Sequence, residues 1–182
     1  MTAAALPVPA DEFRRAMRQL AGGVVMVTTH VDERPWGLTI SAFCSVSVDP
    51  PQILISLASR TVTCTQIQES GEFGISLLAE KHLPLAEVGA ATGAPKFVDE
   101  FCDSDPRGQK PPRVKDALYH LDCVVTSTHL AGDHTLFIAR VEDAVGAASE
   151  AAPNPLLYFD QAYRQMGEGL THHAETHPTA SR

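Results

Sequence analysis

Several widespread motifs are missing from this sequence of 182 residues, and each absence weighs against a class of protein. There is no Gly-x-Gly-x-x-Gly fingerprint of the dinucleotide fold, and no phosphate loop ending in Gly-Lys-Ser/Thr. The Gly-x-Ser-x-Gly elbow of the α/β-hydrolases is missing too. The apolar stretch 21–27 is far shorter than the ~20 residues that a membrane-spanning helix needs.

Basic residues are scarce, with 14 Lys and Arg against 22 Asp and Glu and a formal net charge of −8. Such a chain repels nucleic acids and anionic membrane surfaces at long range. Residues 1–9 place no basic region before their alanines and therefore do not resemble a signal peptide. We expect no nucleic-acid partner, no membrane association and a cytoplasmic location.

No two cysteines form a Cys-x-x-Cys pair. Cys44, Cys64, Cys102 and Cys123 are widely and irregularly spaced, which argues against zinc binding and against a disulfide framework. We expect reduced thiols that are mostly buried. His173 and His177 lie in an unpatterned polar segment, so we predict no metal site there either.

What the sequence does contain is typical of one globular domain, with 44% apolar and 20% charged residues. We predict a single domain over 1–166 and a flexible tail over 167–182. Expected helices are 11–20, 61–70 and 80–91, the last interrupted at Pro84. Expected strands are 24–30, 35–43, 52–58 (buried on both faces), 73–78, 119–130, 134–145 and 155–159. A tight turn is expected at 131–133 and a long loop at 93–115. This pattern favours a mainly antiparallel β-barrel with a few peripheral helices.

Two segments, 37–51 and 56–63, are rich in hydroxyl side chains. The second lies where a strand passes into a helix, so it could hold a phosphate at the helix start or simply cap the helix. The first could be the outer face of a strand, or the lining of a flat slot for a heteroaromatic ring such as a flavin.

Seven segments, taken together in order and spacing, resemble the short-chain flavin reductases, the reductase partners of two-component flavin monooxygenases. The resemblance covers roughly 13–166. Its parts are Phe13-Arg14-Arg15-Ala16-Met17, 22–29, 37–51, 71–78, Lys96-Phe97, Gly132-Asp133-His134 and 155–159.

The resemblance implies an FMN-binding, antiparallel Greek-key split barrel, usually a homodimer with flavin near the subunit interface. It further implies that NADH or NADPH reduces FMN or FAD, and that reduced flavin passes to a partner monooxygenase. The sequence leaves the choice of flavin and of nicotinamide open. Alternatives are a flavoprotein that keeps FMN bound and acts on an organic substrate, a non-catalytic flavin-binding module, and a heme-binding barrel.

The resemblance also implies site residues. Contacts to the flavin ring and ribityl chain are expected from Thr39, Ile40, Ser41, Ala42, Ser45, Val46 and Ser47. The phosphate is expected at Ser56 and at the turn of Ser59, Arg60, Thr61 and Thr63, with Leu57 and Ala58 between them. A loop carrying Lys96 and Phe97 is expected to cover the flavin. Asp133 and His134 are expected at the nicotinamide, with His134 as the catalytic candidate, and Tyr163 is expected to face the site. The chain departs from the pattern at Val88, where a Phe is common.

Overall fold

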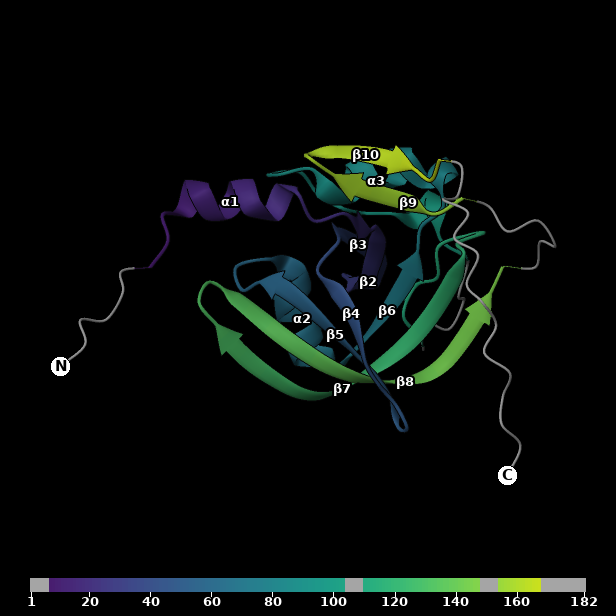
Figure 1. The fold of residues 1–182 in the computed structure, drawn as a ribbon. Coiled ribbons are helices and arrows are strands. Elements are labelled where there is room, and N and C mark those ends of the chain that lie inside the picture. Colours follow the sequence, from purple (N-terminus) through teal and green to yellow (C-terminus); the bar gives the residue numbers. More distant parts are fainter. Residues whose placement is uncertain (1–6, 104–109, 148–153, 168–182) are drawn as a thin grey trace, which may run out of the picture.

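The computed structural model describes residues 7–103, 110–147 and 154–167, and its centre is a strongly curled antiparallel sheet (Figure 1). Seven strands pair in the order β3-β2-β6-β7-β8-β5-β4, and every pairing is antiparallel. Their bounds are β2 Val25–Val31, β3 Arg34–Ile40, β4 Phe43–Val48, β5 Pro51–Ala58, β6 Glu72–Leu77, β7 Tyr119–Ala131 and β8 His134–Gly146. The predicted class, mainly antiparallel β with short helices, is confirmed.

The curl brings strands from opposite halves of the sheet around one core. Val27 of β2, Ile55 of β5 and Phe137 of β8 are fully buried in the same apolar cluster. The two edge strands, β3 and β4, are consecutive in the chain and are joined by residues 41–42. In the described part of the chain these edges do not pair with each other, so the barrel is split at this connection.

Two hairpins of the large sheet follow local turn chemistry. Asp32 and Glu33 join β2 to β3 with φ of 50° and 61°, as a two-residue turn of the favoured twist requires. The predicted turn before β8 is confirmed: Ala131 pairs with His134, and Gly132 has a φ of 62° that a residue without Cβ adopts readily.

A second sheet of three strands was only partly predicted. Its order is β1-β9-β10, with β1 Gly22–Gly23, β9 Leu156–Phe159 and β10 Ala162–Gln165. Gly22 and Gly23 lie outside the strands predicted from the sequence, yet they pair with Tyr158 and Leu157. The return strand β10 was missed.

The described residues form three α-helices. The helices α2 Val62–Ser70 and α3 Leu83–Ala90 pack against the large sheet, whereas α1 Ala10–Arg18 projects to one side and buries no residue (Figure 1). The predicted helix α2 is present. Thr61 caps it, one of the two roles left open for this turn, by accepting a hydrogen bond from Cys64 N at 3.2 Å, and the helix ends at Gly71 with a φ of 74°. The expectation that Pro84 interrupts a helix is wrong. A short 3₁₀ turn, η1 Glu80–His82, precedes α3. Pro84 lies in the first turn of α3, where the missing N–H of proline costs no hydrogen bond.

Two strand predictions also need correction. The strand expected over 35–43 is broken after Ile40, which separates β3 from β4. The strand β5 is not buried on both faces. Ile53, Ile55 and Leu57 point into the core, whereas Leu54 and Ser56 alternate with them and are half-buried.

A buried polar network anchors part of the predicted long loop, which also contains the 3₁₀ turn η2 Asp99–Phe101. His120 joins the Ser76 hydroxyl at 2.8 Å to the Asp122 carboxylate at 3.0 Å, and Arg113 donates to Asp122 at 2.6 Å. Ser76 in turn accepts from the backbone N of Val114 at 3.3 Å. Burial lowers the pKa of His120 to about 4, so the ring is neutral at neutral pH.

The four cysteines are free thiols, and three of them are buried, as predicted. Within the described ranges, no helix combines the length and the apolar character that crossing a membrane requires. The predicted tail lies outside the described residues from 168 onward.

Candidate functional site

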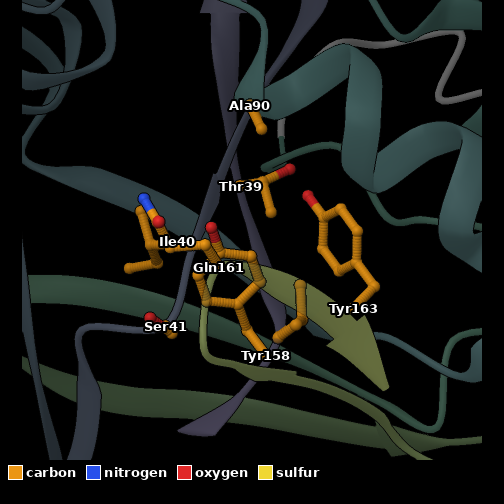
Figure 2. Close-up of a pocket in the computed structure, with 8 residues that line it drawn as sticks. Thr39, Ile40, Ser41, Ala90, Tyr158, Gln161 and Tyr163 are labelled. Atoms are coloured by element: carbon orange, nitrogen blue, oxygen red, sulfur yellow. The ribbon is translucent and has the colours of Figure 1, made fainter. Parts of the chain in front are cut away.

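A cavity of about 420 Å³ lies between β3, the last residue of α3 and the β9–β10 hairpin (Figure 2). Its lining combines apolar walls with hydroxyl and amide groups: Val24, Thr39, Ile40, Ser41, Ala90, Tyr158, Gln161 and Tyr163. Thr39 and Tyr163 point toward one another and donate to the same carbonyl, that of Ala86, at 2.8 Å and 3.2 Å. We call this space the ring cavity.

Gly89 allows α3 to lie close against this wall. A Cβ at this position would stand 2.8 Å from Met26 Cε and 2.9 Å from the backbone N of Thr39, closer than such atoms pack. Sequence reasoning did not identify Gly89. The available signal was a glycine inside a predicted helix with no capping role, which indicates close packing.

A second cavity of about 620 Å³ continues from the first, between α1 and residues 41–43. Ser41, Tyr158 and Gln161 line both spaces, so the two are contiguous. Tyr158 packs against Tyr163 with ring centroids 5.4 Å apart. Neither Tyr158 nor Gln161 was singled out from the sequence. Gln161 sits at the tip of the β9–β10 turn, and its position depends on the missed strand β10.

The two hydroxyl-rich segments meet at the split of the barrel. Ser56 N donates to the carbonyl of Ala42 at 3.1 Å, which places β5 beside the connection between β3 and β4. Two residues further along β5, Ala58 pairs with His134. Ser59 N then donates to the carbonyl of Asp133 at 3.0 Å. The segments predicted for ring, phosphate and nicotinamide are therefore neighbours in the fold, joined by backbone hydrogen bonds.

The hydroxyls of the predicted phosphate turn already have partners. Thr61 donates to Ala58 O at 2.8 Å and caps α2, while Ser59 shares a hydrogen bond with Thr135 at 2.9 Å. Thr63 is fully buried and accepts from Trp36 Nε1 at 3.2 Å, so its hydroxyl faces the core. What the turn offers an anion is the first N–H groups of α2, apart from that of Cys64, which Thr61 binds, together with the exposed side chain of Arg60.

His134 is half-exposed at the start of β8. Its Nδ1 donates to the carboxylate of Asp133 at 2.7 Å, and this bond holds the pKa of Asp133 below its usual range. The bond occupies Nδ1 and leaves Nε2 as the ring atom that can meet a ligand.

Other predicted residues stand apart from the two cavities. Ser45, Val46 and Ser47 lie on the edge strand β4, at a bulge, and Leu57 is buried in the core. Their predicted contacts with flavin stay predictions.

Lys96 and Phe97 contact the elements that carry the cavity wall, α3 and β3. Lys96 Nζ donates to the carbonyls of Gly89 and Ala91 at the end of α3, and burial lowers the pKa of its amine. A cation placed here complements the negative end of the helix. Phe97 packs edge-on against Trp36, with ring centroids 5.1 Å apart. The predicted role of these residues as a flavin cover is untested.

The residues present fit a flat heteroaromatic ligand. The cavity sizes lie within the usual range for small-molecule sites, and apolar walls alternate with hydrogen-bonding groups. No cluster of three or more metal-ligating side chains occurs among the described residues. Such a site binds and orients a ligand, and the ligand itself supplies the difficult chemistry.

Comparison with known proteins agrees with this geometry. Residues 17–167 match the family model described as the flavin reductase like domain. The chain is 36% identical over 157 residues to an NADH-dependent flavin reductase of a Rhodococcus species, with 85% of each chain covered. It is 35% identical over 153 residues to the reductase component of 4-nitrophenol 4-monooxygenase/4-nitrocatechol 2-monooxygenase of Rhodococcus opacus, covering 84% of this chain and 79% of that one. Flavin reductase PheA2 superposes with a TM-score of 0.76 at 32% identity, covering 88% of this chain and all of the other. The chain belongs to the flavin reductase family.

Proposed function

We propose that this protein is an NAD(P)H:flavin oxidoreductase that transfers a hydride from NADH or NADPH to FMN or FAD. The products are the oxidised nicotinamide and the reduced flavin, which also takes up a proton from solvent. The observation that carries the proposal is the ring cavity beside residues 41–42, with the strand that leads into α2 and the Asp133-His134 turn as backbone neighbours, in a chain of this family.

The protein contributes binding and orientation. The stretch from Thr39 to Ala42 holds the flavin ring, and the N–H groups that open α2 hold its phosphate. Tyr158 and Gln161 close the ring cavity from the β9–β10 hairpin. His134 Nε2 meets the nicotinamide. By holding the two rings in contact, these residues would make hydride transfer effectively intramolecular, and no strong general acid or base would be required.

Reduced flavin then leaves for a separate flavin-dependent monooxygenase. The relative from Rhodococcus opacus is named as the reductase component of such an enzyme. We place the reaction in the cytoplasm, and the four free thiols support a reducing compartment.

A homodimer completes the proposal. Leu54, Leu136 and Ile138 lie half-buried on the outer face of β5 and β8, the same face that carries Ser56 and His134. A second copy packed on this face would bury these apolar side chains and place the flavin near the interface. The buried area should exceed about 1,200 Å². Light scattering at micromolar concentration should give twice the chain mass, and a monomer would contradict the dimer.

Release of reduced flavin distinguishes this function from its alternatives. Under anaerobic conditions, the protein is kept on one side of a dialysis membrane that passes flavin and NADH but not protein, and NADH is present on both sides. If the protein is a reductase, flavin on the far side should bleach at a rate that rises with protein concentration, above a protein-free control. A flavoprotein that keeps FMN bound, or a storage module, should leave the far side at the control rate.

A further inference from the structure

A half-buried cation lies beside the ring cavity and takes no part in the proposed hydride transfer. Lys96 Nζ donates to the carbonyls of Gly89 and Ala91, the latter at 2.6 Å. In the described ranges Lys96 forms no ion pair, so carbonyl dipoles alone hold its ammonium. Burial of a cation without a carboxylate partner costs free energy, and it lowers the pKa of this amine. The placement of Lys96 therefore depends on what its ammonium bonds, which is the end of α3.

The carbonyls that Lys96 binds lie in and just after the last turn of α3, where a helix has no donors of its own. Many helices end with a glycine in the left-handed conformation. The helix α3 instead ends at Ala91, with a φ of −57° and a ψ of 134°. A lysine side chain can satisfy such terminal carbonyls and complements the negative end of the helix. Lys96 is therefore the side-chain cap of α3.

The backbone around the same residue is bound to β3. Gly37 N donates to the carbonyl of Lys96 at 2.9 Å, and Val98 N donates to the carbonyl of Pro35 at 3.0 Å. Because β3 is an edge strand of the large sheet, these bonds add residues 96–98 to its outer edge. Lys96 thus binds α3 with its side chain and β3 with its backbone.

Both of these elements supply the wall of the ring cavity. Ala90 lies between the two bonded residues of α3, and Thr39 follows Gly37 by two positions on β3 (Figure 2). Lys96 itself lines neither cavity. We propose that Lys96 is a positioning residue, which holds the end of α3 against β3 and so sets the shape of the ring cavity without touching the ligand. The assignment rests on the proposed function, because the ring that this wall would meet is that of the flavin.

The test compares two substitutions of Lys96 with a matched control. Lys96→Met keeps an unbranched chain but has no donor, whereas Lys96→Arg can still donate to two carbonyls. The control is Lys115→Met, because Lys115 Nζ also donates to a backbone carbonyl, that of Glu100 at 2.9 Å, and lines neither cavity. Fluorescence quenching gives the dissociation constants for FMN and for riboflavin, and calorimetry gives the Tm of the ligand-free protein.

Lys96→Met should weaken FMN and riboflavin by the same factor, about tenfold, because the displaced wall meets the ring that both flavins share. The Tm of the ligand-free variant should fall by about 4–8 °C, since two carbonyls lose their donor. Lys96→Arg should return both affinities to within about threefold of the wild type. Lys115→Met should keep the wild-type affinities.

Several results would overturn the proposal. A lower Tm with unchanged flavin affinities would make Lys96 a structural cap alone. A much larger loss for FMN than for riboflavin would place its ammonium on the phosphate instead. Equal losses in Lys115→Met would show a general effect of removing a lysine. Failure of Lys96→Arg to recover either affinity would show that the paired donors are not the cause.

The comparison remains decisive if Lys96→Met does not fold. Lys96→Gln, which keeps one donor nitrogen on a shorter side chain, then takes its place, with Lys115→Gln as the control. The affinities are measured without nicotinamide, so they test Lys96 even if the protein transfers no hydride. Conversely, wild-type affinities in the Lys96 variants would refute the positioning role and leave the proposed hydride transfer standing.

Discussion

Replacing Gly89 with alanine tests whether close packing of α3 shapes the ring cavity. The new Cβ would stand 2.8 Å from Met26 Cε and 2.9 Å from Thr39 N, and it would also crowd the Thr39 hydroxyl that bonds Ala86. Overpacking costs about 1–3 kcal/mol, and loss of the hydrogen bond adds about 1 kcal/mol. The better helix propensity of alanine offsets about 1 kcal/mol of this loss of stability. The net loss of about 2 kcal/mol should lower Tm by about 4–8 °C.

The same substitution should weaken FMN binding about tenfold, because a displacement of Thr39 alters the wall that meets the ring. Calorimetry and fluorescence titration measure the two effects. Gly23→Ala is the stability control, since a Cβ there meets nothing within 4 Å, and its Tm should stay within about 2 °C. In the double variant Gly89→Ala/Thr39→Ala, the loss of stability should be at least about 0.5 kcal/mol smaller than the sum of the losses of the two single variants. Wild-type Tm and FMN affinity in Gly89→Ala would refute the packing argument.

Three further predictions follow from the site and from the buried network. His134→Ala should lower kcat/KM for NADH about five- to a hundredfold, the effect of losing one positioned hydrogen bond, while the affinity for FMN stays nearly constant. A variant that loses FMN affinity before NADH kinetics change would show that His134 contacts the flavin instead. Thr61→Val should weaken the binding of FMN more than the binding of riboflavin, and equal losses of affinity for both flavins would show that the turn is structural. Thr63→Val should mainly lower the free energy of unfolding, by about 1–3 kcal/mol, because it leaves the buried Trp36 N–H without an acceptor. The folded pKa of His120, about 4, lies below its unfolded value of about 6.5, so the unfolded state binds more protons between these values and stability falls as pH drops. Urea unfolding should show about 2–3 kcal/mol lost between pH 7.5 and 4.5 from this group, and His120→Gln should remove that share. An unchanged pH dependence in the variant would exclude His120 as its source.

Local chemistry made much of the fold predictable. Gly132 and Asp133 between two long β-rich runs predicted the β7–β8 hairpin, and Thr61 and Gly71 marked both ends of α2. The β9–β10 hairpin was missed because Asp160 and Gln161 adopt positive φ without glycine, so the usual sequence signal is missing. Because the hairpin was missed, nothing in the sequence led us to expect Gln161 at the cavity.

The remaining differences come from tertiary contacts that no local pattern contains. The phosphate role that the resemblance implies for Thr63 stays a prediction, but the direction of its hydroxyl is set by Trp36, a partner 27 residues away. Likewise, the apolar run of β5 predicted burial on both faces, yet the described part of the chain leaves one face only half-buried, and Leu54 on this face motivates the proposed dimer.

The central claim is that this protein consumes a nicotinamide only by passing its hydride to flavin. The most direct measurement follows the reduced nicotinamide absorbance while free FMN or FAD is raised from zero to excess, with protein held constant. The account predicts no loss of NADH or NADPH without added flavin, and a rate that rises and saturates with flavin. A rate independent of added flavin, or no consumption of either nicotinamide with both flavins in excess, would contradict it.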